Sequence, residues 1–187
     1  GYTGTGSITN GTTPFYSFVI DVPSSVTWLW TPRTNVPQQF WNLPVVIEEK
    51  GGIHSCALLA NGSPAVAFFS PSANSIYIMY YENLSWQKVQ IVSEIASVGG
   101  LDLAVSPDGK VYVAYYDPAN HGLYLVSNAN QSATGKNGWS VRLIDDLGDS
   151  GKSPEIVFSP FDSTMFISYI DASIGKVRIA RVYEYGA

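Results

Sequence analysis

Short apolar runs separated by tight turns recur along the chain. The two clearest copies begin at Cys56, with CALLANGSPAVAFFSPSANSIYIMYYENLSWQKVQIV, and at Leu101, with LDLAVSPDGKVYVAYYDPANHGLYLVSN followed by GWSVRLID. A third copy, PEIVFSPFDSTMFISYIDASIGKVRIARVY, begins at Pro154. Runs of this length with apolar–polar alternation predict β-strands. No segment combines sustained helical periodicity with a cap, so the pattern predicts an all-β chain.

The turns and tryptophans of the copies fall at equivalent places. The turn between the first two strands reads ANGSP from Ala60, SPDGK from Ser106 and SPFDS from Ser159. Asn-Gly and Asp-Gly favour tight hairpins because they adopt positive φ at little cost. A fourth strand follows each of three tryptophans: Trp41, Trp86 and Trp139. A repeat of about fifty residues built only of short strands is typical of the blades of a β-propeller.

We therefore predict one β-propeller-like domain over residues 1–187, made of four consecutive four-stranded meanders. The predicted blades span residues 2–49, 53–92, 101–145 and 154–185. In the first blade, GSITNGTTPFYSFVID from Gly6 aligns with the turn region of the second copy. This alignment predicts strands at 2–9, 15–22, 26–31 and 45–49.

The last blade is predicted to lack its outer strand, because no tryptophan-containing segment follows VRIARVYEY. An unpaired strand edge invites pairing with another strand. The polar segment Gly1–Thr9 is the candidate to cover this edge, either within one chain or between copies. The N-terminal strand and the edge of the last blade are thus the predicted contacts of a homo-oligomer or filament.

The string VSPDGKVYVAYYD resembles the SPDG hairpins of many bacterial and archaeal propeller repeats. The resemblance covers mainly residues Leu101–Asp145, and it implies architecture without implying an activity. A closed ring of four blades would be similar in size to hemopexin-like domains. The repeat motifs of that family are absent, so it implies no site here.

Composition and charge limit the classes of partner and the location expected for the chain. Apolar residues make up 45% and charged residues 13%, with a formal net charge of −5. Without a basic stripe, nucleic acid is not an expected partner, and without a run of 18 apolar residues no membrane span is expected. A chain that begins at Gly1 rather than Met is expected to be processed. Four N-x-S/T sequons in predicted loops favour an extracellular or cell-surface glycoprotein: Asn10, Asn61, Asn83 and Asn130.

One column of carboxylates follows the second strand of the repeats. It consists of Asp21, Asp117 and Asp171, with Ser70 at the equivalent place in the second copy. Loops on this face of a propeller converge, so these carboxylates are candidate Ca²⁺ ligands. The alternative is that each Asp caps its own turn. Further candidates for a ligand-binding face are the polar residues of the same loops: His54, Asn120, His121, Asp145 and Asp146.

No catalytic arrangement emerges from the sequence. The two histidines, His54 and His121, do not belong to a GxSxG or HExxH motif. Ser55 and Cys56 adjoin His54, but neighbours on a strand point to opposite faces. The single cysteine, Cys56, is expected to be a small buried apolar residue. The glutamates show no recurring pair of the kind that glycosidases use. The chain is therefore predicted not to be an enzyme and to need no cofactor beyond possible Ca²⁺.

Aromatic residues crowd the second and third strands of the repeats. They either pack between blades or stack on bound sugars. The resulting hypothesis is a non-enzymatic extracellular structural or interaction module that self-assembles by strand donation, as a filament or adhesive subunit. The alternatives are a lectin-like propeller that binds carbohydrate and a fragment of a larger propeller enzyme such as a glycosidase.

Overall fold

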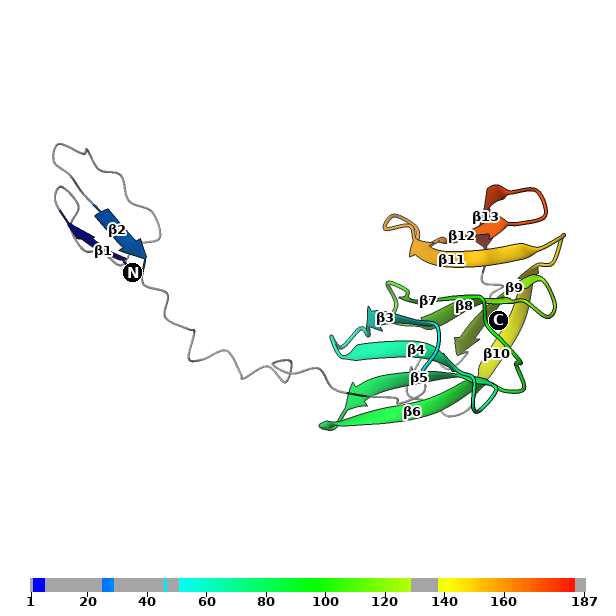
Figure 1. The fold of residues 1–187 in the computed structure, drawn as a ribbon, viewed down its shortest axis with the longest axis horizontal. Helices are drawn as coiled ribbons and strands as arrows, with labels where there is room; N and C mark the ends of the chain where they lie inside the picture. The colour runs from blue at the N-terminus through cyan, green and yellow to red at the C-terminus, as the bar shows by residue number, and fades with distance from the viewer. Residues whose placement is uncertain (1, 6–24, 29–45, 47–50, 129–137, 184–187) are drawn as a thin grey trace. The chain divides into compact units, whose positions relative to one another are not determined.

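The computed structural model describes residues 2–5, 25–28, 46, 51–128 and 138–183 (Figure 1). Contacts divide the chain into two compact units, Gly1–Val45 and Val46–Ala187. In the first unit, β1 (Tyr2–Thr5) pairs antiparallel with β2 (Ser25–Trp28). The sequence predicted a strand at 15–22 between these two segments, and that strand lies outside the described residues.

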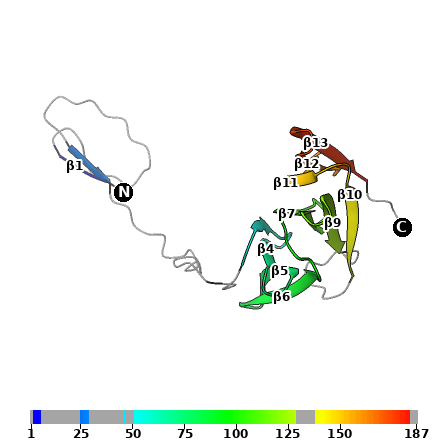
Figure 2. The same ribbon diagram turned by 45° about the vertical axis from the view of Figure 1, so that its right-hand side comes forward.

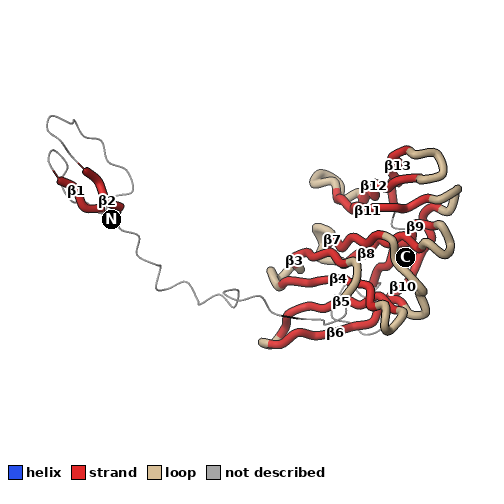
Figure 3. The backbone as a smooth tube through the Cα atoms, viewed as in Figure 1, coloured by secondary structure: helices blue, strands red, loops and turns tan. Residues whose placement is uncertain are grey.

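The second unit contains three antiparallel meanders. Blade 2 has the order β3-β4-β5-β6, blade 3 the order β7-β8-β9-β10, and blade 4 the order β11-β12-β13. Their bounds are β3 His54–Leu58, β4 Pro64–Ser70, β5 Ser75–Glu82, β6 Ser85–Val92, β7 Gly100–Val105, β8 Val111–Asp117, β9 Gly122–Asn128, β10 Trp139–Asp145, β11 Ser150–Phe158, β12 Met165–Asp171 and β13 Lys176–Val182. Figure 3 shows only strands and loops in the described part. The prediction of an all-β array of consecutive meanders is confirmed.

The last blade is three-stranded among the described residues, as predicted. β13 pairs with β12 from Met165↔Val182 to Asp171↔Lys176, and no described strand pairs with its other edge. Gly1–Thr9 was predicted to cover this edge. The structure pairs residues 2–5 with β2, and donation to β13 stays a prediction. No described helix is long and apolar enough to cross a membrane.

The first turns of blades 2 and 3 are closed by the same pattern of backbone hydrogen bonds, and that of blade 4 by a similar one. Gly62 and Gly109 have φ values of 80° and 86°, the left-handed conformation that Asn-Gly and Asp-Gly hairpins require. Ser106 N donates to Lys110 O at 2.8 Å. The third turn is one residue longer, since Ser159 N donates to Thr164 O at 2.8 Å. Ser163 takes the left-handed position there, with φ 57°.

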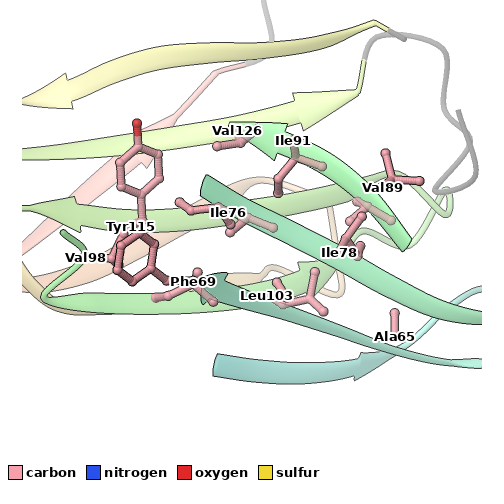
Figure 4. Close-up of a cluster of buried hydrophobic side chains, with 14 of the residues drawn as sticks. Ala65, Phe69, Ile76, Ile78, Val89, Ile91, Val98, Leu103, Tyr115 and Val126 are labelled. Carbon is pink, nitrogen blue, oxygen red and sulfur yellow. The ribbon is translucent and has the colours of Figure 1, made fainter. Parts of the chain in front are cut away.

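The sheets of blades 2, 3 and 4 are stacked one on the next in chain order (Figure 2). We call the face of a sheet that looks toward the following repeat its front face, and the opposite face its back face. The core between blades 2 and 3 combines front-face residues such as Ala65 and Ile78 with back-face residues such as Leu103 and Tyr115 (Figure 4). A second core joins the front of blade 3, including Leu123, to the back of blade 4.

The repeated tryptophans do not play one common role. Trp139 packs, half-buried, against the core between blades 2 and 3. Trp86 instead meets Tyr81 of its own blade edge-to-face, with ring centroids 5.6 Å apart. The expectation of packing between blades therefore holds for Trp139, whereas Trp86 has a ring partner within its blade.

Candidate functional site

The predicted carboxylate column is built into its own turns. Asp117, at the end of β8, accepts hydrogen bonds from Ala119 N at 2.9 Å and from Asn120 Nδ2 at 2.6 Å. Asp171, at the end of β12, accepts from Ser173 N at 3.0 Å and from Ser173 Oγ at 2.5 Å. Both side chains therefore cap turns, the alternative that the sequence left open. Asp21 lies outside the described residues.

Arg178 brings Asp145 and Asp171 together. Its Nη2 lies 2.6 Å from Asp171 Oδ2, and its Nη1 lies 3.1 Å from Asp145 Oδ2. The contact with the fully buried Asp171 is an ion pair rather than an aligned hydrogen bond. Desolvation lowers the pKa of Arg178, but attraction by Asp171 and Asp145 outweighs it, and the net pKa is raised. This guanidinium joins the last strand to the loop that leaves blade 3.

Tyr169 completes this cluster by donating its hydroxyl to Asp145 Oδ2 at 2.6 Å. Burial and this hydrogen bond raise the pKa of Tyr169 to about 12. Desolvation raises the pKa of Asp145, but the hydrogen bonds from Tyr169 and Leu147 N and the charge of Arg178 outweigh this effect. The net pKa of Asp145 is lowered. The carboxylate is thus ionised and fully engaged at neutral pH, which suits a structural role better than ligand binding.

A second cluster centres on Asp149. Lys152 Nζ lies 2.6 Å from Asp149 Oδ2, His121 Nδ1 lies 3.3 Å from Oδ1, and the hydroxyl of Tyr116 donates to the same carboxylate. The hydrogen bonds from Lys152 and Tyr116 are the main reason that the pKa of Asp149 falls to about 2. The sequence placed His121 on this face without identifying Asp149 as its partner.

The other predicted face residues do not join these clusters. His54 is exposed on blade 2, and its Nδ1 lies 3.3 Å from Gly52 O. Asp146 is also exposed. Among the described residues, no group of three or more His, Cys, Asp or Glu side chains is arranged to hold a metal ion. The Ca²⁺ site stays a prediction, since Asp21 belongs to it.

The opposite ends of the strands form a pocket that the sequence did not predict. It lies between the first turns of blades 3 and 4 and has a volume of about 350 Å³, within the range of small-molecule sites. Its lining combines two carboxylates, three hydroxyls and three aromatic rings with two apolar side chains: Ser106, Asp108, Tyr112, Phe158, Asp162, Ser163, Thr164, Met165, Val182 and Tyr183.

Both carboxylates of this pocket are ionised near neutral pH. Asp108 accepts from Ser106 Oγ at 2.5 Å and lies 3.5 Å from Lys110 Nζ. The hydrogen bond from Ser106 is the main cause that lowers the pKa of Asp108. Hydrogen bonds from Ser159 and Thr164 lower the pKa of Asp162 to about 2. The pocket therefore presents two fixed hydrogen-bond acceptors.

Aromatic rings form the apolar side of the pocket. Tyr112 and Phe158 pack with ring centroids 5.5 Å apart. Tyr183 follows β13 and is 58% exposed, with the Arg181 guanidinium 4.9 Å from its ring centroid. The sequence did contain a signal for this pocket, namely the Asp residues inside the SPDG and SPFDS turns. The sequence pattern assigns these residues only a role in turn formation.

The remaining aromatic residues of β8 and β9 pack within the fold. Tyr115 stacks on Tyr124 with ring centroids 5.3 Å apart and an interplanar angle of 13°. Burial raises the pKa of Tyr115 well above its ordinary value. The sequence left open whether such rings pack or stack on sugars. These two pack, whereas Tyr112 reaches the pocket.

Cys56 corrects one expectation. It was predicted to be buried, but its side chain is exposed. Strand alternation is the reason: Ser55 points to the front of blade 2 and donates to Asp102 at 2.8 Å, so Cys56 points to the back face. Of the sequons, Asn61 and Asn83 lie in exposed turns, whereas Asn10 and Asn130 lie outside the described residues. Whether any of them is glycosylated stays a prediction.

No family model matches the chain, and no curated protein matches it. Among solved structures, it is similar to a fucose lectin from Kordia zhangzhouensis in complex with methyl-fucoside, with 11% identity and a TM-score of 0.41 over 70% of this chain and 99% of that one. It is also similar to an α-L-arabinofuranosidase mutant from Fusarium graminearum in complex with an iminosugar inhibitor, with 9% identity and a TM-score of 0.45 over 71% of this chain and 44% of that one. At this level of similarity no ligand or activity transfers to this chain.

Proposed function

We propose that the chain is a non-enzymatic carbohydrate-binding protein whose sugar site is the pocket between the first turns of blades 3 and 4. The observation that carries this proposal is the combination, in one pocket, of ionised carboxylates, hydroxyls and aromatic rings. Sugar hydroxyls donate to carboxylates, while the C–H faces of a sugar ring pack against the electron-rich faces of aromatic rings. This pocket supplies both.

The electrostatics of the pocket favour binding over hydrolysis. A glycosidase needs one carboxyl with a raised pKa that donates a proton to the leaving group. Asp108 and Asp162 both have lowered pKa values. Neither carboxyl holds a proton at neutral pH, so this pocket offers two acceptors and no general acid.

The same charges select the class of sugar. Two carboxylates in one small pocket repel uronic and sialic acids, because like charges at short range cost free energy. Neutral and amino sugars are the expected ligands. A second hollow, in blade 2, has a volume of about 460 Å³ and is lined by Ala73, Asn74, Ser75, Gln90, Ser93, Glu94 and Ala96. It lacks aromatic rings, so it is the weaker candidate.

A glycan array followed by calorimetry tests the proposal. We expect neutral hexoses or amino sugars to bind, and Asp162→Asn and Asp108→Asn each to weaken binding about tenfold, since hydrogen bonds to charged acceptors are stronger than neutral ones. Tyr183→Ala removes an exposed ring and should weaken binding as well.

Asp146→Asn is the matched control, because it makes the same charge change at an exposed position outside the pocket. It should leave affinity unchanged. Absence of any glycan ligand at millimolar concentration, or equal losses in Asp146→Asn and Asp162→Asn, would rule out this pocket as the sugar site.

The self-assembling role expected from the sequence is a separate proposal, and it concerns a different surface. Likewise, the exposed positions of Asn61 and Asn83 are compatible with an extracellular or cell-surface glycoprotein, which suits a protein that binds glycans.

A further inference from the structure

Blade 4 presents an apolar front face to solvent. Val177 and Ile179 of β13 are 75% and 67% exposed, and Val157 of β11 is 59% exposed. Ile170 of β12 pairs with Val177 across the same face. Blade 4 lies at one end of the stack, and this face is turned away from blade 3 (Figure 1).

The equivalent residues of the other two blades are fully covered. Leu123 and Leu125 of blade 3 pair with Tyr116 and Ala114, and they stand where Val177 and Ile179 stand in blade 4. Their exposure is 0% and 3%, because the back face of blade 4 packs on them. In blade 2 the equivalents Ile76 and Ile78 are both fully buried against blade 3.

Polar contacts of Asp102 also join consecutive first strands. Asp102 of β7 accepts from Ser55 Oγ of β3 at 2.8 Å and from Ile156 N of β11 at 2.7 Å. In blade 4 the residue equivalent to Asp102 is Glu155. Glu155 pairs with Ser168 of the second strand, just as Asp102 pairs with Ala114 in blade 3. Glu155 is exposed. Blade 4 thus carries both the apolar surface and the carboxylate that join one repeat to the next.

Blade 2 offers an open part of the matching back face along its first strand, whereas Phe68 and Met79 on the same face are already buried. Its first strand exposes Cys56 and Leu58, and Leu58 is 67% exposed. Cys56 of blade 2 is equivalent to Ile156 of blade 4. Cys56 follows Ser55 and Ile156 follows Glu155, the residues equivalent to Asp102. In blade 3 the residue at this place is Leu103, which is 4% exposed and packed on blade 2.

We propose that the front face of blade 4 docks on the back face of blade 2 of a second copy of this chain. In this contact Val177 and Ile179 are covered by the back face of blade 2, and Glu155 accepts a hydrogen bond from Cys56 N of the second copy. The contact continues the packing that already joins blades 2, 3 and 4. It is head-to-tail, so copies form either a closed ring or an open filament.

Sedimentation of the full-length chain over a micromolar concentration series is the first test. We expect association, and we expect the double variant Val177→Glu and Ile179→Glu to be monomeric at every concentration. Both positions are exposed, so the fold of the variant should be retained, as measured by circular dichroism. The matched control carries Leu84→Glu and Val141→Glu, which add the same charge at exposed positions elsewhere, and should associate normally.

A cross-link identifies the two faces directly. Cys56 is the single cysteine of the chain, so Glu155→Cys creates one new partner for it. Under mild oxidation we expect disulfide-linked multimers of Glu155→Cys in non-reducing gels. The double variant Glu155→Cys and Cys56→Ser should stop at dimers or remain monomeric, and Leu84→Cys should give no multimers.

A monomeric wild-type chain throughout the series would overturn the proposal. So would association that survives in the Val177→Glu and Ile179→Glu variant, or a Glu155→Cys chain that cross-links no further than dimers. None of these substitutions touches the pocket between blades 3 and 4, so glycan binding measured in parallel stands or falls separately.

Discussion

At the scale of single residues, charge pairs hold the ends of the strands in place. Arg178 contacts Asp145 and Asp171, which belong to different blades. Asp171 is fully buried, and a buried carboxylate is tolerated only when it is paired and hydrogen-bonded. The guanidinium and the capped turn at Ser173 supply both conditions.

Replacement of Asp171 by alanine should therefore destabilise the fold. The change removes the turn cap and leaves Arg178 with Asp145 alone, and we expect a loss of about 2 kcal/mol in the free energy of unfolding. Urea denaturation measures it. Asp146→Ala, at an exposed position, is the control and should change stability by less than about 0.5 kcal/mol. Equal values for the two variants would show that the pair contributes little.

Asp149 gives the protein an acid-sensitive contact. Its pKa is lowered from the ordinary value of 3.8 to about 2. A carboxylate whose pKa is lowered in the folded state stabilises the fold fully at pH values above its ordinary pKa. This stabilisation is lost as the pH falls toward the folded-state pKa. The melting temperature should accordingly fall between pH 4 and pH 2, and Asp149→Asn should flatten this fall. A variant whose profile parallels that of the wild type would contradict the assignment.

The sequence singled out Asp145 and Asp171 but not Asp149, and it identified none of their partners. Asp117 and Asp171 end their strands, and this local pattern is enough to predict turn capping. The contacts of Arg178 and of His121 join segments from different turns, and single-residue patterns carry no signal for such pairs. For the same reason the burial of Cys56 was predicted wrongly, because its apolar neighbours do not reveal whether another sheet covers its face.

At the scale of the elements, glycines fix how closely neighbouring blades approach. Gly151 of β11 has φ 114°, and a Cβ atom there would lie 2.8 Å from Leu123 Cβ and 2.9 Å from Leu123 Cα of β9. A side chain would be strained in its backbone and would also push against a neighbouring strand.

Gly151→Ala should therefore cost about 3 kcal/mol of stability, the upper part of the range for strained positions. Gly62→Ala is the comparison. Gly62 also has positive φ, at 80°, but a Cβ atom there would meet nothing within 4 Å. It should cost about 1 kcal/mol. Thermal denaturation of both variants separates the cost of the close contact with Leu123 from the cost of backbone strain. Equal losses of stability in the two variants would show that the contact with Leu123 adds nothing.

The elements themselves were the most predictable part of the chain. Hairpin glycines and alternating apolar residues are local signals, and they placed the three meanders of the larger unit in the right order. The direct pairing of β1 with β2 was missed because the meander pattern placed a further strand, at 15–22, between these two segments. The pocket was missed because its walls come from turns about fifty residues apart.

At the scale of the whole molecule, consecutive repeats bury one face of a sheet against the next. The sequence predicted the free edge of β13 from the absent fourth strand. It did not predict the exposed face of blade 4, because Val177 and Ile179 look like Leu123 and Leu125 in any apolar pattern. Only the stacking order distinguishes the covered pair from the exposed pair.

The hydrogen bonds of Asp102 give the stack a direction that bears on how such chains evolve. The carboxylate of Asp102 accepts from a side chain of the preceding first strand and from the backbone of the following one, so its two neighbours are bound in different ways. A gene duplication that copied one repeat in tandem would therefore insert a unit whose two faces already fit its neighbours. Lengthening or shortening by whole repeats would need no new interface, whereas inverting one repeat would place like faces together.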